Sequence, residues 1–415
     1  MSRSGQKDKP FTIPKRLVWE AYRQVKANKG AAGVDKETLD DFEKDLRGNL
    51  YKIWNRMSSG TYFPPPVKAV EIPKSHGGTR VLGVPTVADR IAQTVVALCL
   101  EPRTERIFHR DSYGYRRRRS AHDALKRCRE RCWTNNWVVD LDIEKFFDSL
   151  DHELVMKTVA SNTDQKWVLL YVKRWLKAPL RLPDGILCER DRGTPQGSAV
   201  SPVLANLFLH YAMDMWLERE FPTVEFERYA DDAVLHCATK WQAQRVRDAL
   251  AARLESLGLR LHPDKTKIVY CKDANRRGSH EHTSFTFLGY TFRPRLARNR
   301  NGQIYASFTP AASKDALKAM GEKIRRWRVN KRTGADLAEI ADWINPIVRG
   351  WMNYYGRFRR SEIYRPLERI NTYLMRWARN KYRRLRGFKK FKRWWIGLVD
   401  REPNLFAHWR WVRGF

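Results

Sequence analysis

Three aspartates in two separate stretches have the residue type and the setting that a hard metal ion requires. Asp142 closes the largely apolar run 137–141, whereas Asp231 and Asp232 lie between the short runs 226–230 and 233–237. If these runs are strands of one sheet, their carboxylates can converge at its edge. Carboxylate oxygens are the ligands that Mg²⁺ prefers. The sequence therefore predicts a magnesium site.

Two Mg²⁺ ions held roughly 3.5–4 Å apart can activate a hydroxyl and stabilise a leaving group in an in-line displacement. In this scheme Asp142 and Asp231 bind the metals together with the adjacent Ile143, and Asp232 completes or orients the ligand shell. Such chemistry needs no histidine as general base. An Asp-Asp pair by itself more often marks a turn, because aspartate is a favoured turn residue, so the surroundings must decide.

Local patterns predict the elements around these aspartates. Helical spacing over 17–55 is broken at 30–33, which indicates two helices around a loop, and the alternation over 67–85 indicates a hairpin that turns at Gly77-Gly78. Residues 137–142 form a buried strand that leads through a turn into a helix. Ser201 is expected to cap a helix with Pro202 at its first position, and Gly258 to end a helix over 242–257. A domain boundary is expected between 295 and 310.

The charge balance indicates an anionic partner. The 415-residue chain, long enough for two or three packed units, carries 80 Lys and Arg against 46 Asp and Glu, a formal charge of +34. Nucleic acid fits this excess best, and an anionic membrane is the rival. With no apolar run of 18 residues and no apolar signal core in residues 1–16, we expect a soluble, untargeted protein. Six scattered cysteines suggest neither a zinc site nor a disulfide framework, and therefore a reducing compartment.

Several blocks in a fixed order resemble a known family. The segment 228–232 (Arg-Tyr-Ala-Asp-Asp) is similar to the Tyr-x-Asp-Asp signature of reverse transcriptases, in the form carried by group II intron maturases. Other matching blocks lie at 80–85, 112–116, 139–148, 193–206, 259–265 and 287–290. The segment 350–355 is similar to the maturase-specific thumb motif. The resemblance extends from about Leu17 to the C-terminus.

The resemblance implies an α+β right-hand polymerase fold with fingers, a palm that contains an antiparallel sheet, a helical thumb and a basic C-terminal region. The implied domains are an N-terminal extension (1–60), fingers and palm (61–295), a maturase thumb (296–375) and a basic, aromatic-rich nucleic-acid-binding segment (376–415). The extension is expected to lie over the template around 30–35. Longer family members carry a C-terminal His/Cys-rich nuclease module. This sequence shows no such motif, so second-strand cleavage is not expected.

The implied function is RNA-directed DNA synthesis with two Mg²⁺ ions, together with binding of intron RNA to assist splicing and mobility. The implied partners are intron RNA, an RNA template with a DNA or RNA primer, target DNA and deoxynucleoside triphosphates (dNTPs), in a prokaryotic cytoplasm and without a membrane. Two alternatives stay open. One is a domesticated reverse transcriptase in defence, CRISPR or repair, and the other is an RNA-binding splicing factor without polymerase activity.

Five residues are expected at the dNTP. Lys74 and Arg80 flank the Gly77-Gly78 turn, so the hairpin can bring both cations over one triphosphate. Gln196, in a glycine-flanked loop, can hydrogen-bond a sugar or base. The resemblance places Lys265 near the leaving phosphate as a proton donor. It also places Phe147 against the ribose 2′ position, with Phe146 as the competing candidate.

Two basic stretches are expected to contact nucleic acid. Where the family usually has Pro-Gly, this chain continues with arginines over 116–119, and Arg116 is expected to suit a template phosphate. Residues 311–415 carry 27 basic and 9 acidic residues, a net +18. Within them, 376–393 combines ten basic residues and no acid with interleaved aromatics, a pattern typical of a nucleic-acid groove. The residues expected to bind there are Arg383, Arg384, Lys389 and Lys390, with Trp377, Tyr382, Phe388 and Phe391 as the aromatic partners.

Overall fold

The computed structural model describes residues 9–73 and 78–414. The chain forms two compact units. The first comprises 1–120, 141–235 and 241–266, and the second comprises 121–140, 236–240 and 267–415. The mixture of helices with largely antiparallel sheets confirms the predicted α+β class. Within the described residues, none of the helices combines the length and apolar character needed to cross a bilayer.

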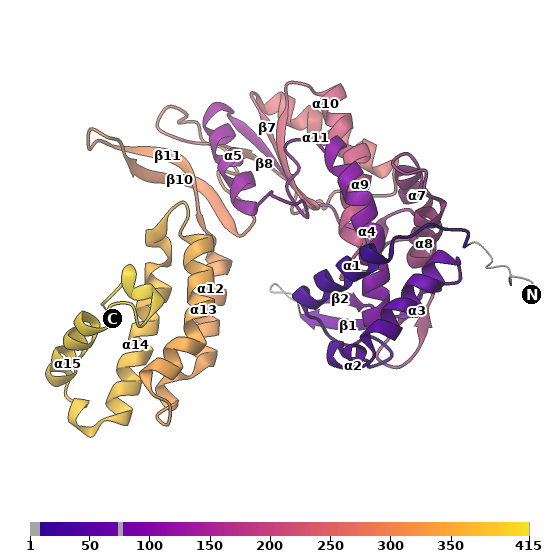
Figure 1. Cartoon of the computed structure of the whole chain (residues 1–415). Coiled ribbons are helices and arrows are strands. Elements are labelled where there is room, and N and C mark those ends of the chain that lie inside the picture. Colours follow the sequence, from indigo (N-terminus) through magenta and orange to yellow (C-terminus); the bar gives the residue numbers. More distant parts are fainter. Residues whose placement is uncertain (1–8, 74–77, 415) are drawn as a thin grey trace, which may run out of the picture. The chain divides into compact units, whose positions relative to one another are not determined.

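The first unit begins with three helices, not the predicted two: α1 (Lys15–Asn28), α2 (Leu39–Glu43) and α3 (Leu46–Ser58). The predicted second helix is divided into α2 and α3, because each part has its own N-cap. Thr38 caps α2 in a capping box, and Asp45 caps α3 by accepting from the Gly48 N–H. Helix α4 (Val87–Ile107) packs against α1, and Figure 1 shows the N-terminal helices grouped around the first hairpin.

The predicted hairpin is confirmed. Strand β1 (Val67–Pro73) pairs antiparallel with β2 (Thr79–Val84), and the sheet continues to β4 (Leu180–Arg181) and β5 (Leu187–Cys188) in the order β2-β1-β4-β5. Lys74 and Gly77 at the turn fall outside the described residues.

Further helices of the first unit bury apolar side chains, and those after Ser201 and over 242–257 were predicted. They are α6 (Phe146–Ser149), α7 (His152–Ala160), α8 (Lys166–Lys177), α9 (Ser201–Leu209), α10 (Met215–Glu220) and α11 (Lys240–Glu255). Val200 and not Ser201 is the N-cap of α9, although Pro202 does lie in its first turn. Between α9 and α10 the π-helix η1 (His210–Asp214) widens the helical turn by one residue.

Both strands predicted around the Asp-Asp pair are confirmed, as is the strand before Asp142. They are β6 (Glu225–Tyr229), β7 (Asp232–Cys237) and β3 (Trp137–Leu141), and with β8 (Lys267–Tyr270) they form a sheet in the order β6-β7-β3-β8. Strands β3 and β8 are antiparallel, with Val138 opposite Val269.

The second unit combines α5 (Ala121–Thr134) with a three-stranded antiparallel sheet and a helical bundle. The strands β9 (Phe285–Phe287), β10 (Tyr290–Arg298) and β11 (Ile304–Ala312) lie in the order β11-β10-β9. The bundle contains α12 (Lys314–Trp327), α13 (Leu337–Tyr355), α14 (Tyr364–Lys381) and α15 (Phe388–Arg401), with short 3₁₀ turns at 329–331, 360–363, 383–385 and 407–410. Figure 1 shows these helices together in the orange to yellow part of the chain.

The positions of the structural boundaries differ from the expected ones. The expected boundary over 295–310 falls inside the β10–β11 hairpin, where Arg295 pairs with Ser307. The expected border at Arg376 falls inside α14. At 295–310 the composition changes, but the backbone pairing of β10 with β11 continues through this segment. At Arg376 the composition also changes, but the apolar face of α14 continues past it. Trp327, Trp377, Trp395 and Trp409 are all buried in one core.

Candidate functional site

The three predicted aspartates lie at the ends of two neighbouring strands. Asp142 directly follows β3, Asp232 begins β7, and β3 and β7 are adjacent in the sheet. Asp231 precedes Asp232 in a tight turn after β6, where Ala230 has a left-handed backbone with φ of 57°. The strand ends therefore bring together two carboxylate groups that are 89 positions apart along the chain.

The electrostatics of these carboxylates show how close they are. Burial, followed by the charges of Asp231 and Asp142, raises the pKa of Asp232 to about 7. Burial and, to a smaller extent, Asp142 also raise the pKa of Asp231. The Lys265 ammonium lies 3.0 Å from Oδ2 of Asp142. Lys265 lowers the pKa of Asp232, and Arg80 and Arg228 lower that of Asp231, yet both pKa values stay raised. The donor set therefore fits a divalent cation held by Asp142, Asp231 and Asp232.

A buried ion pair holds the turn that carries Asp231. The fully buried Arg228 donates to both carboxylate oxygens of Asp214 at 2.7 and 2.6 Å. It also donates to Oδ1 of Asn206 and to the carbonyl of Ala230, each at 3.0 Å. Because Asp214 lies in the π-helix, the widened turn determines where this carboxylate meets Arg228. The arginine thus connects the helix to the tip of the hairpin.

Gly114 allows the chain before α5 to approach the same turn closely. A Cβ atom at this position would lie 2.3 Å from the backbone nitrogen of Ala230, well inside van der Waals contact. Its carbonyl accepts from Nδ2 of Asn206 at 2.7 Å, so Asn206 joins Gly114 to Arg228. The position therefore requires glycine for space rather than for an unusual backbone angle.

The structure brings together two of the residues predicted to contact a dNTP. The Arg80 guanidinium donates through Nε to the side-chain oxygen of Gln196. The backbone N–H of Gly83 donates to the Gln196 carbonyl at 2.8 Å. Gly197, with φ of 113°, lies so near Gly83 that a Cβ would be 2.6 Å from the Gly83 oxygen. The first hairpin is therefore joined to the 193–197 loop. Lys74 lies outside the described residues.

Phe146 and Phe147 form an edge-to-face pair with centroids 5.3 Å apart. Phe146 also packs against Phe208, and its exposed fraction is 2% against 7% for Phe147. The carbonyl of Phe147 accepts from the backbone N–H of Thr194 at 2.8 Å, which places this residue beside the loop that carries Gln196. The neighbouring Ile143 is buried and bridges to Leu261.

The structure gives Arg116 a role other than the predicted template contact. Its side chain is only 4% exposed, forms a bidentate ion pair with Glu105, and donates to the carbonyls of His109 and Ser112 at 2.7 Å. The expectation for Arg116 is therefore wrong. An arginine whose donors are satisfied inside the fold cannot also reach a phosphate at the surface.

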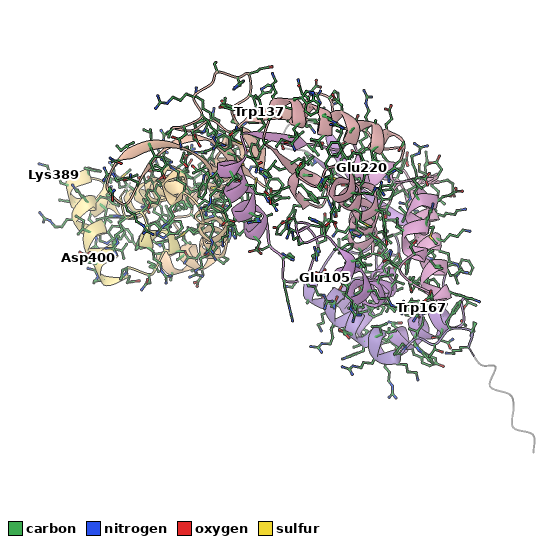
Figure 2. All side chains as sticks on the ribbon, turned by 90° about the horizontal axis from the view of Figure 1, so that it is seen from above. Glu105, Trp137, Trp167, Glu220, Lys389 and Asp400 are labelled. Carbon is green, nitrogen blue, oxygen red and sulfur yellow. The ribbon has the colours of Figure 1, made fainter. Side chains whose placement is uncertain are left out.

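The C-terminal cations and aromatics differ in their exposure. Arg383, Arg384, Lys389 and Lys390 are exposed, and Lys389 is labelled near the start of α15 in Figure 2. The expectation that the interleaved aromatics meet nucleic acid is wrong for two of them, because Trp377 and Phe391 are fully buried. Tyr382 is half-buried, with its ring edge-on to Trp377, whereas Phe388 is 51% exposed. The aromatic periodicity follows the bundle core more than a stacking surface.

Tyr115 is a site residue to which the sequence reasoning assigned no role. Burial raises its pKa first, and the charge of Asp231 raises it further while that of Arg80 lowers it. The side chain therefore lies near both the carboxylates and the first hairpin, although it remains 52% exposed. Its backbone φ of 57° is unusual for a residue with a side chain. No local pattern distinguishes such a tyrosine from an ordinary one.

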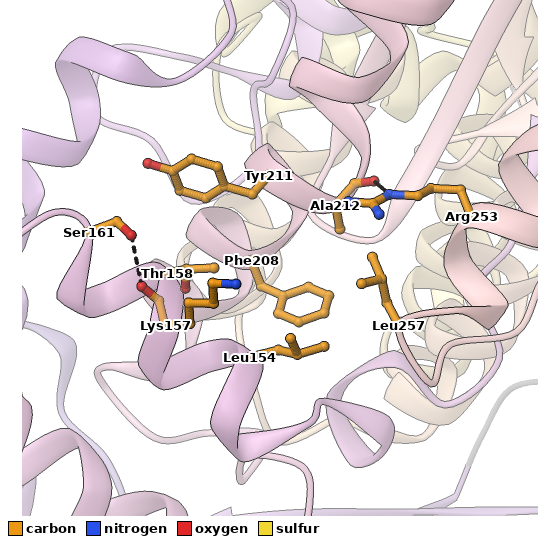
Figure 3. Close-up of a pocket in the computed structure, with 9 residues that line it drawn as sticks. All are labelled: Leu154, Lys157, Thr158, Ser161, Phe208, Tyr211, Ala212, Arg253 and Leu257. Carbon is orange, nitrogen blue, oxygen red and sulfur yellow. Dashed lines mark hydrogen bonds between the residues drawn. The ribbon is translucent and has the colours of Figure 1, made fainter.

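A pocket of about 290 Å³, lined by both apolar and polar side chains, lies apart from this chemistry. Figure 3 shows its lining from α7, α9, η1 and α11, with Phe208 and Leu257 on its wall and Arg253 donating to the Ala212 carbonyl. None of the predicted site residues lines it.

Comparisons with known proteins show which families the chain resembles. The profile described as "Reverse transcriptase (RNA-dependent DNA polymerase)" matches residues 72–292, and "Group II intron, maturase-specific domain" matches residues 317–395. Protein YkfC of Escherichia coli is 31% identical in an alignment of length 331 that covers 70% of this chain and 82% of that protein. The group II intron-encoded protein LtrA of Lactococcus lactis is 26% identical, over 82% of this chain and 68% of LtrA. A solved structure of telomerase from Candida albicans covers 89% of this chain and 67% of its own, with a TM-score of 0.46 and 13% identity.

Proposed function

We propose that this chain, which belongs to the family of reverse transcriptases and carries a group II intron maturase-specific domain, extends a primer on an RNA template by using Asp142, Asp231 and Asp232 to hold two Mg²⁺ ions. The observation that carries the proposal is the convergence of these carboxylates, whose mutual repulsion and burial raise the pKa of Asp232 to about 7. Bound Mg²⁺ would compensate that charge, activate the primer hydroxyl and stabilise the leaving pyrophosphate.

The remaining roles are assigned to residues around the carboxylates. The primer 3′ hydroxyl would lose its proton to water, its oxygen would form a bond to the α-phosphorus of the dNTP, and the bond from that phosphorus to the pyrophosphate oxygen would break. Arg80 and Gln196, which already contact each other, would bind the nucleotide from the side of the first hairpin. Lys265, now paired with Asp142, would donate a proton to the departing phosphate. Phe147 would exclude a ribose 2′-hydroxyl.

Primer extension on an RNA template is the test of this proposal. The wild-type chain is expected to incorporate dNTPs with Mg²⁺. Ca²⁺ is expected to permit nucleic-acid binding with little turnover, because it is larger and accepts a looser coordination geometry. A chain that binds RNA but never extends the primer under Mg²⁺ would instead be an RNA-binding splicing factor.

Replacing Phe147 is expected to change sugar selection. Phe147→Ala opens space beside the nucleotide, so the ratio of ribonucleotide to deoxyribonucleotide incorporation should rise. The measurement is kcat/KM for one ribonucleotide and for its deoxy counterpart on the same template-primer.

Phe146→Ala is the matched control, because it removes the same ring from the neighbouring position. Phe146 is 2% exposed and packs against Phe208, so the free energy of unfolding should fall by about 3–5 kcal/mol while sugar selection stays unchanged. If the two variants exchange these effects, Phe146 is the selecting ring and the assignment of Phe147 is wrong.

We further propose that the exposed cations of the maturase-specific domain bind structured intron RNA, which would support splicing and mobility. Neutralising Arg383, Arg384, Lys389 and Lys390 together should weaken RNA binding and make the slope of log affinity against log salt shallower, because fewer counterions are released. Addition of a single nucleotide on a saturating short template-primer should change much less.

The control removes the same charge from another surface. Lys157, Lys166, Lys173 and Lys177 on α7 and α8 are also exposed, so neutralising them isolates the effect of position from that of net charge. An unchanged salt slope in the first quadruple variant, or equal losses in both, would show that the C-terminal cations form only a solvated surface.

A further inference from the structure

A chain of buried polar side chains connects helix α4 to the loop that carries Gln196. At its centre, Oδ1 of Asp89 accepts hydrogen bonds from the Tyr62 hydroxyl at 2.9 Å and from the Trp175 indole at 2.7 Å. Its Oδ2 accepts from Nε2 of Gln93 at 2.9 Å. Asp89 is fully buried, and Gln93 is 1% exposed. Neither residue was predicted to belong to a site.

The far end of the same glutamine holds the loop. Oε1 of Gln93 accepts from the Ser198 hydroxyl at 2.6 Å and from the backbone N–H of Ala199 at 2.8 Å. The Ser198 N–H in turn donates to the Pro195 carbonyl at 3.2 Å. One side-chain amide therefore joins α4 to residues two and three positions beyond Gln196.

Asp89 on one side and the Ala199 N–H on the other determine which way this amide points. An ionised carboxylate only accepts hydrogen bonds, so Gln93 must turn its NH₂ group toward Asp89 and its oxygen toward the loop. The opposite orientation would set the NH₂ group against the N–H of Ala199 and leave two buried donors facing each other. Burial raises the pKa of Asp89 to about 6 even though its three donors oppose that rise. All three donors point at the carboxylate oxygens, which is the arrangement that favours the ionised form.

We propose that Asp89 is a positioning residue for the nucleotide site: by orienting the Gln93 amide, it holds the 193–201 loop where the Gln196 side chain meets Arg80. This inference deepens the proposed function, since it depends on Gln196 and Arg80 binding the dNTP. Gly83 also donates to the Gln196 carbonyl, so a displaced loop would lose its contact with the first hairpin.

Asp89→Asn tests the polarity of this chain of hydrogen bonds without changing its shape. The oxygen of the asparagine would face the Tyr62 and Trp175 donors, so its NH₂ group would face Gln93. Two NH₂ groups would then meet, or the Gln93 amide would turn over and place its NH₂ group against the Ala199 N–H. We expect KM for the dNTP to rise about tenfold with a much smaller change in kcat, which corresponds to about one lost buried hydrogen bond. Amide hydrogen exchange in 193–201 should become faster.

The double variant Asp89→Asn/Gln93→Glu should restore the wild-type properties. The NH₂ group at position 89 can donate to the new carboxylate at position 93, whose other oxygen accepts from Ser198 and Ala199 as before. Every buried group is again paired, and the total charge is unchanged. A return of KM to within about twofold of wild type, with slow exchange in the loop, is a result that a mere loss of stability would not produce.

Tyr62→Phe is the control on the other side of Asp89. It removes one donor but leaves the polarity of the Gln93 contact intact, so stability should fall while KM and loop exchange stay at wild-type values.

A folded Asp89→Asn variant with wild-type KM and loop exchange would overturn the proposal. If Asp89→Asn does not fold, a folded double variant decides, because a raised KM there would equally overturn it. An inactive wild type contradicts the proposed function, whereas the exchange measurements still test the positioning of the loop.

Discussion

Asp232→Ala is expected to abolish primer extension on an RNA template while leaving RNA affinity nearly unchanged, and Asp142→Ala should do the same. The reason is that, in the proposed function, the carboxylates hold the metal whereas a separate basic surface binds the nucleic acid. Asp232→Asn is the sharper form of the experiment, since it keeps the shape of the side chain and removes only the charge. Single-turnover extension and RNA binding would be measured on the same preparations.

Asp248→Ala is the matched control for these variants. Asp248 lies on α11, its side chain is 65% exposed, and it pairs only with the adjacent Arg247 among the described contacts. The control should extend primers at the wild-type rate. An equal loss of RNA affinity and of extension in the Asp142 and Asp232 variants would contradict their assignment as metal ligands, because it would indicate a general loss of the folded surface.

Arg228→Met is expected to lower the free energy of unfolding by about 3–5 kcal/mol, because it leaves the Asp214 carboxylate buried without its partner. Both side chains of this ion pair are fully buried, so water cannot replace the missing guanidinium. Denaturant unfolding followed by fluorescence would give the difference. Arg219→Met is the control, since Arg219 is 73% exposed in its pair with Glu220 and should change stability by less than about 1 kcal/mol.

The double variant Arg228→Met/Asp214→Leu separates stability from function. Replacing both charges with apolar groups should recover much of the lost stability, because no unpaired charge stays buried. Extension should nevertheless remain low, since Arg228 also donates to the Ala230 carbonyl in the turn that carries Asp231. If extension recovers together with stability, the contact with Ala230 does not position the carboxylates.

The sequence by itself determined the parts of this protein that depend on local patterns. The short runs on either side of Asp231 and Asp232 predicted β6 and β7, because two short strands around a turn residue need only neighbours along the chain. The alternation over 67–85 predicted the first hairpin for the same reason. The order of motif blocks indicated the family, and the charge of +34 indicated an anionic partner.

Only the tertiary structure decided which polar and aromatic side chains of the basic stretches are buried within the fold and which are exposed. Arg116 and Arg383 both lie in arginine-rich stretches of the sequence. Arg116 is nevertheless buried and bonded to Glu105 and two carbonyls, whereas Arg383 is exposed. Likewise Trp377 lies within a basic stretch but belongs to the bundle core. Composition cannot distinguish these cases, because burial depends on which elements pack against the residue.

The contacts that position the site join residues far apart along the chain. Asp89 accepts from Trp175, 86 residues away, and Gln93 accepts from Ser198, 105 residues away. A hydrogen bond of this kind has no periodicity and leaves no local pattern, because it forms only once α4, α8 and the loop have packed together. The three aspartates proposed to bind metal are therefore visible in the sequence, whereas Asp89 and Gln93, which contact the 193–201 segment through hydrogen bonds, emerge only from the packed fold.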